Sequence, residues 1–252
     1  MIHRTRQLGP VSLTLVVAHV LASHSLGIEA AEQKNATAPA LERYNVVWER
    51  PSKDAAGQMP LGNGDIAAGV YALEDGDLYL LLAKNDALTY NGDIFKTGRV
   101  RVSLEPNPFE KGKPFRQTLD LATGSIRIEA GGVNLRVWAD ANRPVYHVQI
   151  DSPREIAVTA APEFWTRFDD CKHNTSRAPI DPPTQDVRLD RNGRILWYFA
   201  VGARSVFPAE MEYYDVKHMA STFPDPYRFN TFGNLLDSPD LDLKDGVLKG
   251  KG

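Results

Sequence analysis

The sequence is poor in cysteine. Cys171 is the only one in 252 residues, so no disulfide can form within the chain and its stability must come from a buried core. No activating pattern surrounds Cys171, which favours a partly buried small residue over a reactive thiol. Cys171 and His173, even with His147 and His218, match no standard zinc spacing. We therefore predict neither a metal site nor a cofactor.

The chain also lacks an excess of positive charge. Its 29 basic and 32 acidic residues give a net charge of −3. Without a basic stripe it is a poor candidate for binding nucleic acid, and neutral ligands such as sugars fit better. Phosphate loops, dinucleotide fingerprints and Gly-x-Ser-x-Gly elbows are missing as well. These absences argue against nucleotide-binding enzymes and serine hydrolases of the elbow type.

Only one long apolar run is present, and it lies near the start. Arg4 and Arg6 precede an apolar stretch over residues 11–22, and small residues follow over 25–31. This order is typical of a secretory signal, which we place at residues 1–30 and expect to be cleaved. The stretch is shorter than the roughly 20 residues that span a bilayer, so we expect no membrane anchor. The sequence therefore predicts a secreted or periplasmic protein.

What remains is dominated by short segments in which apolar and polar residues alternate. Alternation with a period of two places one apolar face on each strand. The predicted strands cover residues 65–73, 78–83, 100–104, 125–129, 133–138, 145–150, 156–160, 188–190 and 195–201. Turn residues over 74–77, and Asn192-Gly193 in a type I′ turn, predict two hairpins. Strands with one solvent-exposed face favour an all-β fold. We predict a large antiparallel two-sheet β-sandwich of the super-sandwich type.

The boundaries follow from composition. Residues 31–43 predict a flexible lead, residues 44–236 the β-sandwich domain, and residues 237–252, rich in charge and glycine, a flexible end. Within the sandwich, four prolines predict a long loop without regular ladders over residues 162–185. From Phe207 onward the chain reads as irregular and aromatic.

The turn Gly62-Asn63-Gly64-Asp65 is the first candidate ligand site. Glycines on both sides of Asn63 allow positive φ, so the Asn63 amide and the Asp65 carboxylate can project from an edge and hydrogen-bond sugar hydroxyls. The alternative is that both side chains satisfy their own Asx-type turn. The sequence leaves both readings open.

Lys84-Asn85-Asp86 is the second candidate, because it directly follows an apolar strand and should emerge at a sandwich edge. If Asp65 and Asp86 converge, they would form a carboxylate pair of the kind that glycosidases use. An ion pair between Lys84 and either aspartate is the simpler interpretation.

Four tryptophans are candidates for stacking on sugar rings: Trp48, Trp138, Trp165 and Trp197. Trp197 lies in an apolar strand run and is expected in the core. Trp165 lies among charged residues of the proline-rich loop and is the one we expect to be exposed. It would either contact a ligand or pin the loop to the sandwich.

The pattern around the Asn63 turn has a known counterpart. Residues 59–71, with 48–52 before them and 81–87 after them, resemble the start of the N-terminal β-sandwich domain of glycoside hydrolase family 95, the α-L-fucosidase group. They are more similar still to an uncharacterised relative of that domain. Residues 96–102 and 224–233 extend the resemblance.

The resemblance implies a function. Complete family members carry their catalytic carboxylates on an (α/α)6 helical barrel that follows the sandwich, and this sequence ends at Gly252, where the barrel would begin. We therefore expect an exported domain with no catalytic residues of its own. It would support carbohydrate hydrolysis by a missing or separate catalytic domain, with a glycan and a helical catalytic domain as its partners.

Two other interpretations stay open. One is a stand-alone carbohydrate-binding module that uses the Asn63 corner or Trp165. The other is an independent glycosidase that uses Asp65 and Asp86. The chain departs from the family at Asp65, where fucosidases commonly carry an arginine after Gly-Asn-Gly, so the resemblance does not extend to fucose specificity.

Overall fold

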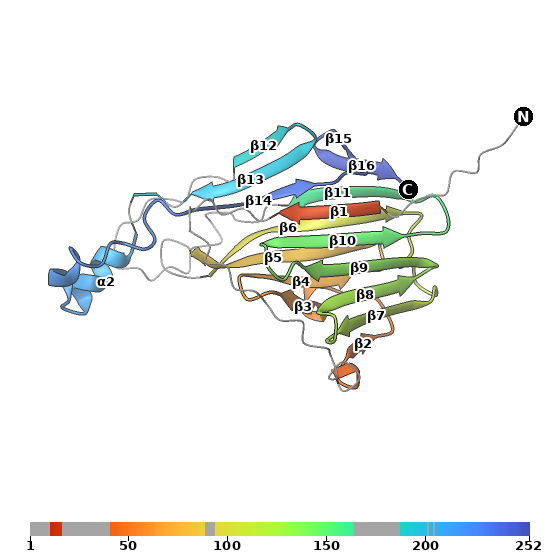
Figure 1. Cartoon of the computed structure of the whole chain (residues 1–252), viewed down its shortest axis with the longest axis horizontal. Helices are drawn as coiled ribbons and strands as arrows, with labels where there is room; N and C mark the ends of the chain where they lie inside the picture. Colours follow the sequence, from red (N-terminus) through yellow and green to blue (C-terminus); the bar gives the residue numbers. More distant parts are fainter. Residues whose placement is uncertain (1–10, 17–40, 89–93, 164–186, 201, 204) are drawn as a thin grey trace, which may run out of the picture.

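The computed structural model describes residues 11–16, 41–88, 94–163, 187–200, 202–203 and 205–252. Two antiparallel sheets make up most of this part of the chain (Figure 1). The short elements outside the sheets are the α-helix α2 (Phe207–Tyr213) and the 3-10 helices η1 (Ala55–Gly57) and η3 (Lys217–Met219). No helix within the described ranges has the length and apolar character needed to cross a bilayer.

The larger sheet has nine strands. In spatial order they are β12 (Val187–Arg191), β13 (Arg194–Ala200), β14 (Thr231–Asp237), β1 (Val11–Val16), β10 (Val145–Asp151), β9 (Val133–Ala139), β8 (Ser125–Ala130), β7 (Phe115–Asp120) and β2 (Val46–Trp48). All its neighbouring strands are antiparallel. Strand β1 joins the five strands from β10 to β2 to the three strands from β12 to β14.

The smaller sheet has seven strands. Their order is β15 (Asp242–Lys244), β16 (Val247–Lys251), β11 (Ala157–Glu163), β6 (Ile94–Glu105), β5 (Asp77–Leu88), β4 (Ile66–Ala72) and β3 (Met59–Gly62). The described chain is therefore the all-β antiparallel two-sheet structure that the alternating sequence predicted.

One hydrophobic cluster fills the space between the two sheets. Leu78, Leu80 and Leu82 on β5 and Ile126 and Ile128 on β8 are each at most 1% exposed, because alternate residues of each strand face the opposite sheet. Burying a side chain of this size stabilises the fold by about 1.5–3 kcal/mol. This core fixes the strand register, since a slip of one residue would turn each apolar set towards water.

A bulge in β6 fastens the sheets to each other. Gly98 pairs with Leu82 and Lys96 with Ala83, so Thr97 between them is the extra residue. Its carbonyl oxygen accepts hydrogen bonds from Trp197 Nε1 at 2.9 Å and from Asn234 Nδ2 at 2.7 Å, both on the larger sheet. The expectation that Trp197 belongs to the core is confirmed.

Both predicted hairpins are present. The turn between β4 and β5 has Gly76 at a φ of 100°, and the turn between β12 and β13 has Asn192 at 52° and Gly193 at 75°. Positive φ at both central residues is the requirement of a type I′ turn, which Asn-Gly meets with little strain.

The prediction of a flexible end over residues 237–252 was wrong. Strand β16 pairs with β11, and Leu248 is fully buried in the core. A Cβ on Gly250 would lie 2.7 Å from Leu241 Cδ2, so this glycine marks close packing rather than flexibility. The sandwich therefore extends past the predicted boundary at residue 236 to Lys251.

Two further expectations need correction. Pro162 lies inside β11, opposite Val100 of β6, beyond the point where β16 stops pairing, so its missing N–H costs no ladder bond. The region after Phe207, read as irregular, contains α2 and strand β14. The predicted proline-rich loop from residue 164 onward, Trp165 included, falls within residues 164–186, which lie outside the described residues.

The predicted signal segment is described only over Val11–Val16, which forms β1 between β10 and β14. Residues 1–10 and 17–40, including most of the predicted flexible lead, lie outside the described residues. Export stays a prediction.

Candidate functional site

The Asn63 corner lies in the turn between β3 and β4. Asn63 Oδ1 accepts hydrogen bonds from the backbone N–H groups of Asp65 and Ile66, each at 3.0 Å. Its Nδ2 donates to the carbonyl oxygens of Asp140, at 2.7 Å, and Arg143, at 3.0 Å. The Asx-type interpretation is confirmed for Asn63, whereas the Asp65 carboxylate accepts from Lys84 instead. Because both amide hydrogens and the amide oxygen have protein partners, Asn63 fastens the two sheets at this end of the sandwich.

Lys84 forms the centre of a charged cluster beside this corner. It continues the inward-facing series of β5, so its side chain is only 6% exposed. The Lys84 Nζ lies 2.6 Å from Asp65 Oδ1 and 2.7 Å from Asp86 Oδ1, and both aspartate side chains are about half exposed. The predicted ion pair is confirmed, and it includes both aspartates.

The charge state of Lys84 follows from these contacts. Burial by itself lowers the pKa of Lys84, but hydrogen bonds and charge attraction from Asp65 and Asp86 outweigh it, and the pKa lies above its ordinary value. Lys84 is therefore an ammonium at neutral pH. It neutralises one of the two carboxylate charges.

The geometry brings Asp65 and Asp86 together. The two Lys84 distances hold their bonded oxygens at most about 5.3 Å apart, no farther than the carboxyl separation of about 5–5.5 Å in retaining glycosidases. The space between them is filled by the Lys84 ammonium. A glycosidic oxygen would have to displace that ammonium before it could lie between the carboxylates.

Tyr146 is a residue that sequence reasoning missed. It lies on β10, is fully buried, and its hydroxyl has no hydrogen-bond partner among the described residues. Burial, together with the charge of nearby Asp65, raises the pKa of its hydroxyl. The sequence does not distinguish Tyr146 from an ordinary core tyrosine, because the alternation places it on the buried face whether or not its hydroxyl has a partner.

A hollow of about 440 Å³ lies beside the charged cluster, over the ends of β3, β4 and β5. Asp65 and Lys84 line it together with the exposed Asn85 and Ile94. The backbone N–H of Asn85 donates to the Asp65 carbonyl oxygen at 2.8 Å, which holds the two segments side by side. Of the predicted site residues, the structure therefore gathers Asp65, Lys84, Asn85 and Asp86 and places Asn63 next to them.

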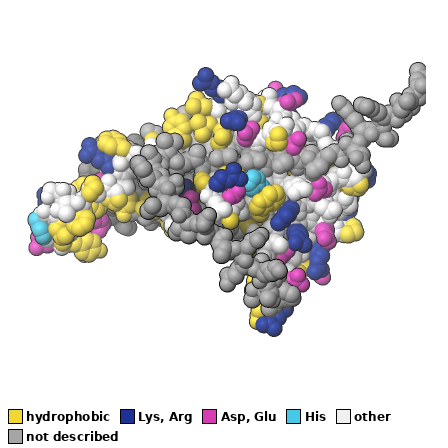
Figure 2. Space-filling model, in the orientation of Figure 1, with side chains coloured by type: hydrophobic (Ala, Val, Ile, Leu, Met, Phe, Trp, Pro, Cys, Tyr) yellow, Lys and Arg dark blue, Asp and Glu magenta, His cyan; other side chains and the backbone are white. Residues whose placement is uncertain are grey.

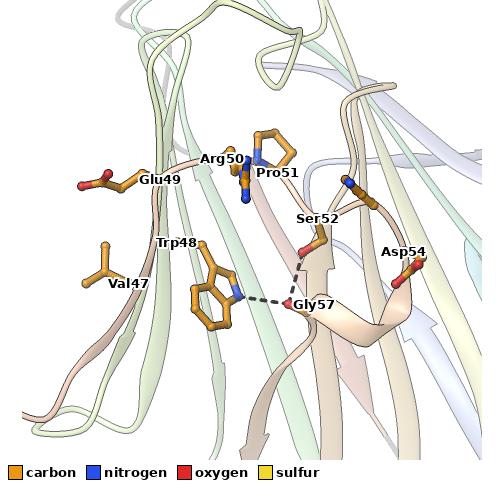
Figure 3. Close-up of a pocket in the computed structure, with 9 residues that line it drawn as sticks. Val47, Trp48, Glu49, Arg50, Pro51, Ser52, Asp54 and Gly57 are labelled. Carbon is orange, nitrogen blue, oxygen red and sulfur yellow. Dashed lines mark hydrogen bonds between the residues drawn. The ribbon is translucent and has the colours of Figure 1, made fainter.

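A larger hollow, of about 780 Å³, lies around Trp48 at the edge strand β2 (Figure 3). Trp48 Nε1 and Ser52 Oγ both donate to the carbonyl oxygen of Gly57, at 3.1 Å each, which fixes the indole edge. The exposed Trp48 shares this hollow with the charged side chains of Arg50 and Asp54. An exposed aromatic ring beside polar groups suits the alternating faces and hydroxyls of a sugar.

The turn between β9 and β10 supplies the other partners of Asn63. Hydrogen bonds from the Arg143 guanidinium and from the Asn142 backbone lower the pKa of Asp140 to about 2. Trp138, at the end of β9, stacks on His147 with ring centroids 4.8 Å apart. The sequence signal for this turn is the Asp-Ala-Asn-Arg run at 140–143, but nothing in the run points to Asn63, 77 residues earlier.

Within the part of the chain that the structure describes, no group of three histidine, cysteine, aspartate or glutamate side chains is placed to hold a metal ion. Cys171 and His173 lie outside that part.

The model of a domain of unknown function, the N-terminal domain DUF5703_N, matches residues 47–251. The match runs from β2 to β16 and so includes the charged cluster and most of both sheets. No curated protein matches the chain.

Proposed function

We propose the following role for this chain, which belongs to the DUF5703 N-terminal domain family: it is an exported, non-catalytic β-sandwich that supports glycan hydrolysis by a separate catalytic domain. The proposal joins the predicted signal segment, the resemblance to family 95 glycoside hydrolases and the geometry of the charged cluster.

The position of Lys84 is the observation that carries the non-catalytic part. A glycosidase needs a carboxyl group that can give a proton to the leaving oxygen and a second one within reach of the sugar or of a water. Here the Lys84 ammonium lies between Asp65 and Asp86 and binds both. The cluster therefore suits an ion-paired anchor at the sandwich end better than an acid and a base.

The resemblance supports the choice of partner. The segments that resemble family 95 include β3, β4 and most of β5, which frame the Asn63 corner and the smaller hollow. In that family the sandwich packs on an (α/α)6 barrel, which carries the catalytic carboxylates. An exported partner with such a barrel would supply the chemistry that this cluster does not.

A stand-alone carbohydrate-binding module is the second candidate, and the hollow around Trp48 is the observation that favours it. Its volume of about 780 Å³ fits the range of roughly 300–1,000 Å³ that is typical of small-ligand sites. The sugar would stack on Trp48 and bond to Arg50 and Asp54.

The test begins with hydrolysis and binding by the purified exported chain, measured on a panel of aryl glycosides and on an oligosaccharide array. Asp65→Asn and Asp86→Asn are the test variants, and Glu129→Gln, an exposed carboxylate on β8, is the matched control. We expect no turnover by the unchanged chain or by any of the three variants. Turnover that either aspartate variant abolishes would overturn the proposal in favour of an independent glycosidase.

Chemical crosslinking in the secreting cell tests the partner directly. We expect mass spectrometry to find crosslinks from this chain to a helical barrel with glycoside hydrolase carboxylates. Glycan binding by the chain alone, lost in Trp48→Ala and accompanied by no such crosslink, would favour the binding module instead.

A further inference from the structure

Strand β1 occupies an interior place in the nine-stranded sheet (Figure 1). Its six residues pair with β10, from Val11 opposite Ile150 to Val16 opposite Val145. Three of them also pair with β14, from Thr14 opposite Asp237 to Val16 opposite Leu235. Among the described strands, β1 is the link between β10 and β14. The sheet therefore has one strand position between β10 and β14, which β1 fills.

The occupant of this place is the predicted signal segment. Residues 11–16 lie inside the span 1–30 that we expect to be cleaved on export. Cleavage would leave backbone N–H and C=O groups of β10 and β14 unpaired beside the core residues Val148, Ile150 and Leu236, which are at most 1% exposed with β1 in place. Unpaired backbone groups in such a place are strongly disfavoured, so the exported chain needs another strand there.

The neighbouring strands specify what would fit. Both β10 and β14 are antiparallel to β1, so they run parallel to each other and accept a strand of one direction only. On β10 the buried residues Tyr146, Val148 and Ile150 alternate with the half-buried His147 and Gln149. Since residues directly opposite each other share a face of the sheet, the incoming strand should be apolar opposite the first three and polar opposite the other two.

The sequence of residues 11–16 meets this rule. Val11, Leu13 and Leu15 are opposite Ile150, Val148 and Tyr146, and Ser12 and Thr14 are opposite Gln149 and His147.

The segment that would follow cleavage does not meet it. Residues 31–40 read Ala-Glu-Gln-Lys-Asn-Ala-Thr-Ala-Pro-Ala, with no alternating large apolar residues and with a proline. An outside donor is therefore the better occupant.

We propose that the place between β10 and β14 is an acceptor site for a β-strand donated by a partner polypeptide. The donor is an extended segment of about six residues, antiparallel to both neighbours, with alternating apolar and polar residues. Main-chain hydrogen bonds would hold it, and the apolar face of the donor would set its register. The inference rests on the export step of the proposed function and is independent of which glycan, if any, the protein meets.

The first experiment uses the full chain, exported by a secreting host and purified, with its N-terminus determined by sequencing. The probe is a fluorescent synthetic peptide of residues 9–18. We expect a chain that has lost residues 1–30 to bind the peptide, and its Tm to rise with peptide concentration. The same peptide with Leu13→Pro should bind at least ten-fold more weakly, because proline has no N–H for an interior ladder.

The second experiment tests the register. In a Cys171→Ser background, Gln149→Cys should form a disulfide with the peptide carrying Ser12→Cys, because these positions are directly opposite. The peptide carrying Leu13→Cys is the control and should react at least ten-fold more slowly.

Four results would overturn the inference. An exported chain that still begins at Met1 would make β1 a permanent strand. No peptide binding, or equal crosslinking at positions 12 and 13, would remove the acceptor site. A stable dimer that the peptide does not dissociate would replace the partner polypeptide by a second copy. None of these results depends on the glycan and hydrolysis screens, so the two proposals fail separately.

Discussion

The side-chain amide nitrogen of Asn63 lies 2.7 Å from the carbonyl oxygen of Asp140, which is on the opposite sheet. This bond, with the second one to Arg143 at 3.0 Å, ties the turn between β3 and β4 to the turn between β9 and β10. A residue that sequence reasoning placed at a ligand-facing corner is therefore a connection between the two layers of the sandwich.

We expect Asn63→Ala to lower the free energy of unfolding by about 2 kcal/mol, because it removes two donors and one acceptor that are all bonded in a partly buried turn. Urea unfolding measures the loss. Asn85→Ala, at an exposed position on β5, is the control and should change stability by less than about 0.5 kcal/mol. Loss of glycan binding by Asn63→Ala at unchanged stability would contradict the structural role.

The same reasoning applies to Lys84, whose ammonium binds two carboxylates from a buried position. Lys84→Met leaves Asp65 and Asp86 close together without a cation. Removing one partner of a fully buried pair costs about 3–5 kcal/mol, and half exposure of both aspartates reduces this to about 1–3 kcal/mol. Thermal unfolding at pH 7 measures this loss of stability, and Lys111→Met, at an exposed position, is the control.

The pH dependence of this pair has a defined sign. The pKa of Lys84 is raised in the folded state, so its contribution is fully present below its ordinary, unfolded pKa and is lost as the pH rises through the folded value. The stability difference between the wild type and Lys84→Met should therefore be constant near neutral pH and shrink above about pH 10.5. If the stability difference between the wild type and Lys84→Met already shrank between pH 7 and pH 6, the raised pKa of Lys84 would not be its cause.

Much of the fold could be predicted because alternation and turn chemistry are local. The hairpin of β4 and β5 and the Asn192-Gly193 turn follow from residues next to one another in sequence. The ion pair of Lys84 could be anticipated for the same reason, since Asp86 is two residues away and Asp65 directly precedes β4, which pairs with β5 from Ile66 opposite Lys84.

What could not be predicted depends on contacts between distant segments. The composition of residues 244–251 suggests a flexible segment. They form strand structure because β16 pairs with the edge of β11 and because Leu248 is buried in the core. The partners of Asn63 lie 77 and 80 residues away on the other sheet, and the carbonyl of Thr97 meets Trp197 100 residues later. A pattern of single residues carries no information on such pairs.

The bulge at Thr97 gives a fourth prediction. Gly98 has a φ of 137°, and a Cβ there would lie 2.8 Å from Trp197 Nε1. Gly98→Ala should therefore combine backbone strain with displacement of the indole that bonds to Thr97, and lower the free energy of unfolding by about 3 kcal/mol. Gly112→Ala is the matched control, because Gly112 also has positive φ, 88°, but its Cβ would meet nothing within 4 Å. The control should lose about 1 kcal/mol; equal losses would contradict the role of the indole contact.

The last prediction concerns the Tyr146 hydroxyl, which is buried and has no hydrogen-bond partner among the described residues. Removing a polar group that is already unsatisfied relieves a desolvation cost and leaves no new orphan. Tyr146→Phe should therefore keep or raise the free energy of unfolding, by up to about 1 kcal/mol. Tyr79→Phe is the control, since the Tyr79 hydroxyl donates to Asp77 at 3.2 Å and its removal should cost about 1 kcal/mol.

Comparing these two variants in the same urea series separates a bonded hydroxyl from an unbonded one. A loss at Tyr146→Phe as large as that at Tyr79→Phe would mean that the hydroxyl has a partner in solution. The charged group to consider is Asp65, which contributes to the raised pKa of Tyr146. A water between the two would then extend the Lys84 cluster into the core, and Tyr146→Phe should cause no additional loss in an Asp65→Asn background, because the two residues would share one interaction.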